Sequence, residues 1–255
     1  MSYHPGKFTW FEHMSTDPAK AKGFYEGLFG WQVRPVTMSD GAAYDMIYNG
    51  EQGIGGMYAA PAGVPGHWVS YLSVTDIDAA YRAALAAGAK SVMPPTQFSD
   101  VGRGATVIDP SGAVVSIWKG AQGDRDDVER TPAGDWIWSE LYTHDTAKSL
   151  AFYEQVFGYT HDAMDLGAQG TYYALNGANG KGRGGVMKAP DESMQPQWVP
   201  YVCVEDVDKT AAMVAPLGGK LLMGPEDIPG VGRFAVLADP LGAQVAMLRP
   251  QPMPA

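Results

Sequence analysis

Cysteine, basic residues and long apolar runs are all scarce in this chain. Its single cysteine, Cys203, cannot form an internal disulfide, so nothing in the sequence requires an oxidising compartment. Only 18 Lys and Arg stand against 28 Asp and Glu, and a formal net charge of −10 argues against polyanionic partners. No stretch approaches the roughly 18 apolar residues of a membrane helix, and Met1 to Lys7 carries no signal-peptide pattern. We therefore expect a cytoplasmic protein that binds neither nucleic acid nor membranes.

Glycine and proline, in contrast, are abundant. The 255 residues include 32 Gly and 19 Pro, which predicts many short elements joined by tight turns. Hydrophobic residues make up 45% of the chain, enough to bury a substantial core.

An internal repeat dominates the sequence. The segment Trp10 to Asp17 returns as Trp138 to Asp145, 128 residues later. Further pairs follow at offsets of 128 to 130: Phe24-Tyr25 with Phe152-Tyr153, Phe29-Gly30 with Phe157-Gly158, Gly55-Gly56 with Gly184-Gly185, Trp68-Val69 with Trp198-Val199, Gly102-Arg103 with Gly232-Arg233, and Asp109-Pro110 with Asp239-Pro240. The chain is a duplication, and we expect domains at residues 1–120 and 135–250 joined by a polar linker at 121–134.

Each repeat divides again into two similar halves. Residues 9–14 alternate like a strand, Asp17 and Pro18 predict the start of a helix that Gly30 ends, and strand-like runs follow at 31–36, 44–48 and 54–58. The second half repeats this plan, with a strand at 68–74, a helix from Asp76 to Gly88, and strands at 91–98, 105–108 and 114–118. The pattern predicts a βαβββ module four times in the chain.

These modules carry motifs that resemble a known superfamily. The motifs are Asp17, Phe24-Tyr25 and Phe29-Gly30, then Val74-Thr-Asp76, Gly88 and Asp109-Pro-Ser-Gly112, with counterparts in the second repeat. The chain resembles the vicinal-oxygen-chelate superfamily, which includes glyoxalase I, extradiol dioxygenases and bleomycin-resistance proteins. The resemblance implies an α+β fold of tandem glyoxalase-like domains, each a curved eight-stranded sheet built from two modules.

The resemblance also implies where metal ligands would stand. In metal-using members a His precedes each of the two capping Asp residues by seven positions, and a Glu follows the Asp-Pro-x-Gly glycine by four. The corresponding residues here are Trp10, Val69 and Ser116 in the first repeat, and Trp138, Val199 and Ala246 in the second. None is a strong ligand for a divalent metal. We therefore expect no metal cofactor, and a divalent ion only at a relocated site formed by Glu12 and His67.

Glu12 and Glu140 are the candidate catalytic residues. Alternation places each on the strand face of the lost ligand position, where a buried carboxylate must be paired or protonated. Such a residue serves either as a general acid or base and ligand anchor, or as a structural hydrogen-bond partner. We expect His13 and His144, near the strand ends, to be solvated, and Cys203 to be buried and inert.

Eight further residues are candidates for ligand binding. Trp10, Trp138, Trp68 and Trp198 could wall a pocket or belong to the core. Tyr71 and Tyr201 could donate to a ligand oxygen or be core tyrosines with internal partners. Arg103 and Arg233 could clamp a carboxylate or lie in surface turns.

Three functions remain open from the sequence. The first is a metal-independent protein that binds, and so sequesters, a small aromatic or amphipathic molecule in barrel-shaped pockets. The second is a glyoxalase-like lyase or isomerase, or a dioxygenase-related enzyme, that detoxifies dialdehydes either metal-free or with the relocated ion. The third is an interaction scaffold whose pockets are filled by side chains. We expect a monomer with an internal pseudo-dimer, or a homodimer.

Overall fold

The computed structural model describes residues 1–167 and 170–251, and its elements repeat one order four times. The first repeat contains β1 (Phe8–Ser15), α1 (Pro18–Phe29), β2 (Gln32–Thr37), β3 (Ala43–Asn49), β4 (Gln52–Ala59), β5 (His67–Ser73), α2 (Ile77–Ala86), β6 (Lys90–Phe98), β7 (Gly102–Ile108) and β8 (Val114–Gly120). The second contains β9 (Trp136–Thr143), α3 (Thr146–Phe157), β10 (Thr160–Asp165), β11 (Thr171–Asn176), β12 (Gly182–Lys188), β13 (Gln197–Cys203), α4 (Val207–Val214), β14 (Lys220–Ile228), β15 (Gly232–Ala238) and β16 (Gln244–Pro250). The predicted α+β fold of four βαβββ modules is confirmed.

The helices begin and end where the sequence predicts. The Asp17 side chain accepts a hydrogen bond of 3.0 Å from the backbone N–H of Lys20, which caps the first turn of α1. Gly30 ends that helix with φ of +71°, a left-handed conformation that glycine adopts without steric cost. In the second repeat, Asp145 and Gly158 cap α3 in the same way. The cap residues therefore fix both helices to the same length.

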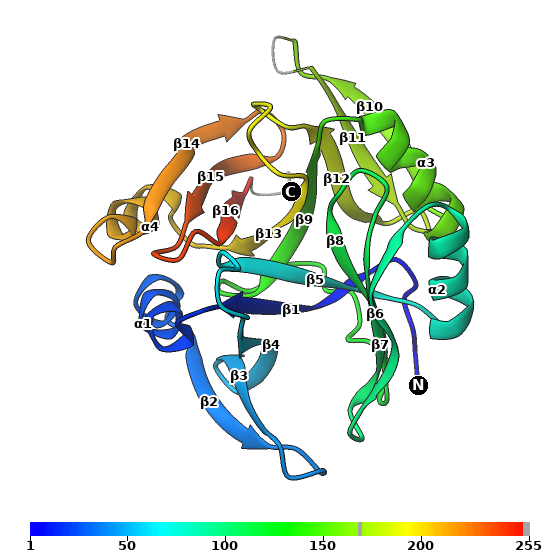
Figure 1. Cartoon of the computed structure of the whole chain (residues 1–255). Coiled ribbons are helices and arrows are strands. Elements are labelled where there is room, and N and C mark those ends of the chain that lie inside the picture. Colours follow the sequence, from blue (N-terminus) through cyan, green and yellow to red (C-terminus); the bar gives the residue numbers. More distant parts are fainter. Residues whose placement is uncertain (168–169, 252–255) are drawn as a thin grey trace. The chain divides into compact units, whose positions relative to one another are not determined.

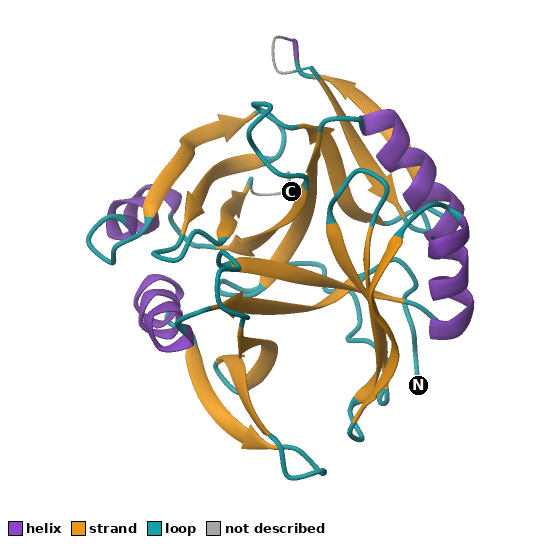
Figure 2. Ribbon diagram, viewed as in Figure 1, coloured by secondary structure: helices purple, strands orange, loops and turns teal. Residues whose placement is uncertain are grey.

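Each repeat contributes one eight-stranded sheet. The strand orders are β2-β3-β4-β1-β5-β8-β7-β6 and β10-β11-β12-β9-β13-β16-β15-β14. The inner pairs β1–β4 and β5–β8 are parallel, as are β9–β12 and β13–β16, whereas the outer hairpins are antiparallel. Figure 2 shows how few helices accompany these strands.

The compact units of the structure combine halves of both repeats. Unit 1 consists of residues 1–10, 69–127 and 139–198, and unit 2 of residues 11–68, 128–138 and those from 199 onward. Within unit 1, α2 of the first repeat lies beside α3 of the second, and within unit 2, α1 lies beside α4 (Figure 1). The two repeats therefore contact one another inside each unit.

A separate apolar core fills each unit. In unit 1, Leu72, Ile117 and Leu141 are fully buried in a cluster that also contains Phe152 and Tyr153. In unit 2, Ile47, Leu237 and Met247 are fully buried. Side chains from both repeats thus share each core, and burial of this apolar surface is the main force that holds the halves together.

The segment between β8 and β9 contains neither strand nor helix, and Asp127 ties it into unit 1. The Asp127 carboxylate accepts two hydrogen bonds from Arg183, of 2.7 and 3.1 Å, and lies 3.2 Å from Lys7 and 3.1 Å from Lys181. These donors, Arg183 foremost, lower the pKa of Asp127 far below its usual range. Among the described residues, no helix is long and apolar enough to cross a membrane.

Candidate functional site

The first-repeat site, which we define by Glu12, Tyr44 and Gly56, lies within unit 2. Glu12 is only 8% exposed, and its Oε1 accepts a hydrogen bond of 2.8 Å from the Tyr44 hydroxyl. Gly56 is the register partner of Glu12 on the parallel neighbour β4. A Cβ atom at Gly56 would overlap the Tyr44 hydroxyl, so the glycine leaves the space through which Tyr44 reaches Glu12. A buried carboxylate is thereby paired with a neutral donor.

The second-repeat site, defined by Glu140, Tyr172 and Gly185, repeats the buried glutamate, its glycine register partner and the neighbouring tyrosine within unit 1. Glu140 is 6% exposed and its register partner on β12 is Gly185. A Cβ at Gly185 would overlap the Tyr172 hydroxyl, as at the first site. Sequence reasoning missed both tyrosines, although Tyr44 and Tyr172 are separated by the same 128 residues as the glutamates. That offset is the signal that could have found them.

Trp68 and Trp198, two of the predicted ligand-binding residues, are buried beside tyrosines of α1 and α3. In unit 2, Trp68 Nε1 donates to the Tyr25 hydroxyl at 2.9 Å; in unit 1, Trp198 Nε1 donates to Tyr153 at 2.6 Å. Each indole N–H is therefore satisfied inside the protein, which favours the core interpretation of these two residues. Trp10 and Trp138 are half-buried on β1 and β9.

The two other pairs of predicted ligand-binding residues lie on different parts of the modules. Tyr71 and Tyr201 are buried, and their register partners are Ser116 and Ala246, the positions that the resemblance assigned to a Glu ligand. Arg103 at the start of β7 instead donates to both oxygens of Asp78, the Nη2 bond measuring 3.0 Å.

Arg233 has the same arrangement in the second repeat. Its guanidinium donates to Asp208 at 2.7 and 2.8 Å and to Asp227 at 3.1 Å. The hydrogen bonding of the guanidinium to Asp208 is the largest cause of a raised pKa at Arg233. Both arginines therefore already bind carboxylates of the protein itself, and clamping a ligand carboxylate would require exchange of these partners.

His13 is not solvated, contrary to the expectation from its place in the sequence. It is fully buried in unit 2, and its Nε2 lies 2.7 Å from Asp239 Oδ2. The same oxygen accepts a hydrogen bond of 3.1 Å from Tyr25. The expectation failed because β1 continues to Ser15, so His13 lies inside the strand on the face packed with Tyr25 and Trp68. Burial is the largest single influence and would raise the pKa of Asp239, but His13 and the backbone N–H groups of Leu241 and Ala243 together outweigh it, so that pKa is lowered.

Unit 1 contains the same network without the histidine. The Tyr153 hydroxyl donates a hydrogen bond of 3.0 Å to Asp109 Oδ2. The residue that corresponds to His13 in the second repeat is Leu141. In each unit the tyrosine and the aspartate come from different repeats. His144 is partly exposed and lies 3.6 Å from Glu192, and Cys203 is buried, with a thiol pKa that burial raises.

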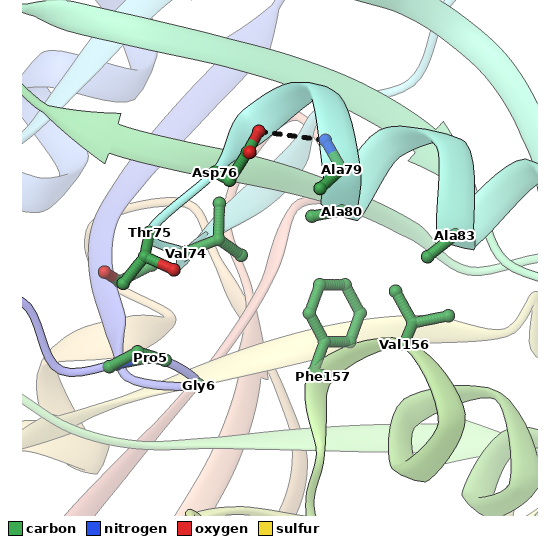
Figure 3. Close-up of a pocket in the computed structure, with 11 residues that line it drawn as sticks. Pro5, Gly6, Val74, Thr75, Asp76, Ala79, Ala80, Ala83, Val156 and Phe157 are labelled. Atoms are coloured by element: carbon green, nitrogen blue, oxygen red, sulfur yellow. Dashed lines mark hydrogen bonds between the residues drawn. The ribbon is translucent and has the colours of Figure 1, made fainter.

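A separate pocket of about 280 Å³ lies in unit 1 (Figure 3). Val156 and Phe157 at the end of α3 face Ala80 and Ala83 of α2 across it. Its other lining residues are Pro5, Gly6, Ser73, Val74, Thr75, Asp76 and Ala79. The Asp76 carboxylate accepts a 2.9 Å hydrogen bond from the N–H of Ala79 as the helix cap. The pocket is thus largely apolar, and within the described chain its lining includes none of the residues predicted for the site.

A family model matches each repeat separately. The model described as Glyoxalase/Bleomycin resistance protein/Dioxygenase superfamily covers residues 7–117 and again residues 137–247. The chain belongs to this superfamily. The predicted resemblance is therefore confirmed, as is the tandem arrangement of the glyoxalase-like sequence.

Two kinds of curated relative match this chain over nearly its whole length. "Putative glyoxylase CFP32" of Mycobacterium tuberculosis is 38% identical over 98% of this chain and 97% of that protein. "Anthracycline biosynthesis protein DauV" of Streptomyces sp. is 28% identical over 94% of this chain and 92% of its own length.

Solved structures show the same fold at low sequence identity. The Mn(II)-bound glyoxalase from Novosphingobium aromaticivorans is 17% identical, with a TM-score of 0.64 over 96% of this chain and 82% of that one. The 2,3-dioxygenase LapB from Pseudomonas sp. KL28 is 12% identical, with a TM-score of 0.65 over 100% and 96% of the two chains. Both comparisons support the superfamily fold.

The residues at the superfamily's metal positions do not fit a metal ion. Val69 and Val199 are buried and apolar, and the buried Ser116 hydroxyl lies 2.8 Å from that of Thr106. At the relocated position, His67 Nδ1 lies 2.9 Å from the carbonyl of Pro65. Within residues 1–167 and 170–251, no group of three or more His, Cys, Asp or Glu side chains could hold an ion. At these positions, the described side chains therefore differ from the imidazole and carboxylate donors that divalent metals prefer.

Proposed function

We propose that this superfamily member binds a small organic molecule at the first-repeat and second-repeat sites through Glu12 and Glu140. The observation that carries the proposal is the buried carboxylate of Glu12. It accepts a hydrogen bond of 2.8 Å from the Tyr44 hydroxyl, which reaches it across Gly56. The second repeat duplicates the glutamate, the tyrosine and the glycine at the same strand positions. The tyrosine requires the glycine for steric reasons, so the recurrence of the buried glutamate in both repeats is what supports a ligand role.

The chemistry of this arrangement suits a ligand that donates a hydrogen bond. A carboxylate has about four acceptor positions, so it can accept from a ligand hydroxyl while Tyr44 occupies one of them. The tyrosine ring supplies an apolar wall for the same molecule. The name of the anthracycline biosynthesis relative agrees with an aromatic ligand. Binding alone would sequester such a molecule, which is the role we consider first.

A second candidate function is a glyoxalase-like lyase or isomerase that acts without the usual metal, for example on a dialdehyde. The same carboxylate favours it, because Glu12 could accept a proton from a substrate carbon beside a carbonyl and return it to a neighbouring atom. Tyr44 would hold the carboxylate in place during that transfer. The name of the CFP32 relative agrees with this class.

Glu12→Gln and Glu140→Gln test the ligand role. Each keeps the side-chain shape but removes the charge and the easily transferred proton. If the glutamates serve a ligand, the melting temperature stays nearly unchanged while binding weakens about tenfold or more, roughly 1.4 kcal/mol. Thermal-shift screening of small molecules supplies the ligand, since a molecule that binds the folded state raises its stability. A loss of about 1–3 kcal/mol in stability with unaltered binding contradicts the proposal.

Activity assays separate the two candidates. The purified protein is incubated with dialdehydes, with and without a chelator, after its metal content has been measured. Product formation that survives chelation and disappears in Glu12→Gln or Glu140→Gln supports the enzyme. Tight binding without product supports sequestration. Chelator-sensitive activity with about one equivalent of bound metal would instead support the relocated ion.

We further propose that a single chain is the functional unit in the cytoplasm, because each compact unit is completed within one chain. Sedimentation equilibrium measures this directly: a mass near 27.2 kDa is expected, and a stable mass of twice that value would indicate the homodimer.

A further inference from the structure

Near each glutamate, one strand carries a methionine and its neighbour a tyrosine, and the two repeats place these two residues on opposite strands. In the first repeat, Met14 on β1 is the register partner of Tyr58 on β4. In the second repeat, Tyr142 on β9 is the register partner of Met187 on β12. Both pairs lie two residues beyond the Glu–Gly pair on the same strands, so side-chain alternation places them on the same sheet face as the glutamate.

The exchange changes which aromatic side chain is accessible. Tyr58 is 41% exposed, whereas Tyr142 is 3% exposed. The Tyr58 ring lies 5.1 Å from the ring of Tyr44, the residue that holds Glu12. The first-repeat site therefore presents an exposed ring beside its glutamate, and the second-repeat site has a half-buried methionine at the equivalent position on β12.

The charge around Tyr58 restricts the ligand. Partial burial and the negative charges of Glu12 and Asp40 raise the pKa of Tyr58, so its hydroxyl stays protonated and able to donate at neutral pH. The same two carboxylates repel an anionic ligand and favour a neutral or cationic one. A planar ring with a hydroxyl donor satisfies both the tyrosine face and the Glu12 acceptor.

We propose that the two sites have different specificities: the first-repeat site binds a neutral planar hydroxylated molecule between Tyr58 and Glu12, and the second-repeat site does not. Tyr58 and Met187 are the residues that determine this difference. The inference rests on the proposed ligand role of the glutamates and adds the class of ligand and the number of molecules bound per chain.

Fluorescence and calorimetric titration of the full chain with 2-naphthol tests the proposal. This probe is a neutral planar ring with one hydroxyl donor at neutral pH, and 2-naphthoate is its anionic control. We expect one 2-naphthol per chain, no comparable binding of 2-naphthoate and about tenfold weaker binding for Tyr58→Met. Tyr81→Phe, which alters a tyrosine outside both sites, should leave binding unchanged. Glu12→Gln should weaken binding as strongly as Tyr58→Met.

A reciprocal exchange tests specificity independently of loss-of-function effects. The double variant Tyr142→Met with Met187→Tyr reproduces the first-repeat arrangement in the second repeat while conserving total side-chain volume, and should bind a second 2-naphthol. If the unaltered chain binds two molecules of 2-naphthol with equal affinity, and Glu12→Gln and Glu140→Gln each weaken one of them, the inference is overturned but the proposed function remains intact. Insensitivity of binding to both Glu→Gln variants would overturn both. Absence of 2-naphthol binding, or unchanged binding in a folded Tyr58→Met variant, overturns the inference as well.

Discussion

The Tyr25 hydroxyl of the first repeat donates a hydrogen bond of 3.1 Å to Asp239 of the second repeat, and both groups are buried in unit 2. In unit 1, Tyr153 of the second repeat donates the corresponding hydrogen bond, of 3.0 Å, to Asp109 of the first repeat. The superfamily motifs Phe-Tyr and Asp-Pro-x-Gly, far apart in each repeat, therefore meet in pairs from opposite repeats. They fasten the two halves of each compact unit.

Loss of either tyrosine hydroxyl should destabilise the protein. Tyr25→Phe and Tyr153→Phe each leave a buried carboxylate and a buried indole N–H with one partner fewer. We expect each to lower the free energy of unfolding by about 1–3 kcal/mol. Urea unfolding measures this. The half-buried Tyr81 donates a solvent-exposed hydrogen bond of 2.6 Å to Ser91 and is the matched control, and Tyr81→Phe should cost less. Equal stability of all three variants contradicts the assigned role.

Replacement of His13 should be far less harmful than replacement of its partner. His13→Leu installs the residue that unit 1 has naturally, and Asp239 keeps Tyr25 and the backbone N–H groups of Leu241 and Ala243. We expect a cost within about 1 kcal/mol. Asp239→Ala leaves several buried donors unpaired and should cost about 3–5 kcal/mol. Comparable losses in the two variants, measured by urea unfolding, would show that His13 is as important as the carboxylate.

The glycines beneath the site tyrosines should not accept a side chain. Gly56→Ala and Gly185→Ala introduce a Cβ that overlaps the hydroxyls of Tyr44 and Tyr172. We expect each to cost about 1–3 kcal/mol and to displace the tyrosine. Gly23→Ala is the control, because this helical position has no other atom within 4 Å of an added Cβ. It should stabilise α1 by up to about 1 kcal/mol. Thermal unfolding that ranks Gly23→Ala with the other two would refute the steric argument.

Asp127 should contribute to stability except in acid. Its pKa is lowered in the folded protein, chiefly by Arg183, so its contribution is present above the unfolded pKa of about 3.9 and is lost as pH falls through the lower folded value. The free energy of unfolding, measured in urea between about pH 7 and pH 3, should fall less steeply below about pH 4 in Asp127→Asn than in the unaltered chain. Asp126, whose side chain is 89% exposed, is the control, and Asp126→Asn should leave the acid slope unchanged.

The elements of the fold could be predicted because their signals are local. Asp17, Pro18 and Gly30 fix one helix through contacts within a few residues, and the repeat multiplies that evidence. The burial of Glu12 was likewise predictable from alternation along one strand. Its partner Tyr44 was not, because the two residues lie 32 positions apart and meet only when β3, β4 and β1 are aligned in register.

The arrangement of the compact units could not be predicted for a different reason. Both repeats carry the same motifs, so Tyr25 could satisfy the pattern equally well with Asp109 or with Asp239. Only the three-dimensional structure distinguishes pairing within a repeat from pairing between repeats. The expected domains at 1–120 and 135–250 describe the repeats of the sequence and remain a prediction for how the chain folds.

The composition of unit 2 has a consequence for the synthesis of the protein. Residues 11–68 leave the ribosome early, but apart from residues 128–138 the rest of unit 2 begins only at Val199. At about 5–20 residues per second, the roughly 130 residues between Trp68 and Val199 leave the apolar face of α1 without its partner α4 for roughly 7–26 seconds. Unit 1, whose segments 69–127 and 139–198 are nearly adjacent, can close first. The nascent chain should therefore depend on chaperones mainly through its first 68 residues.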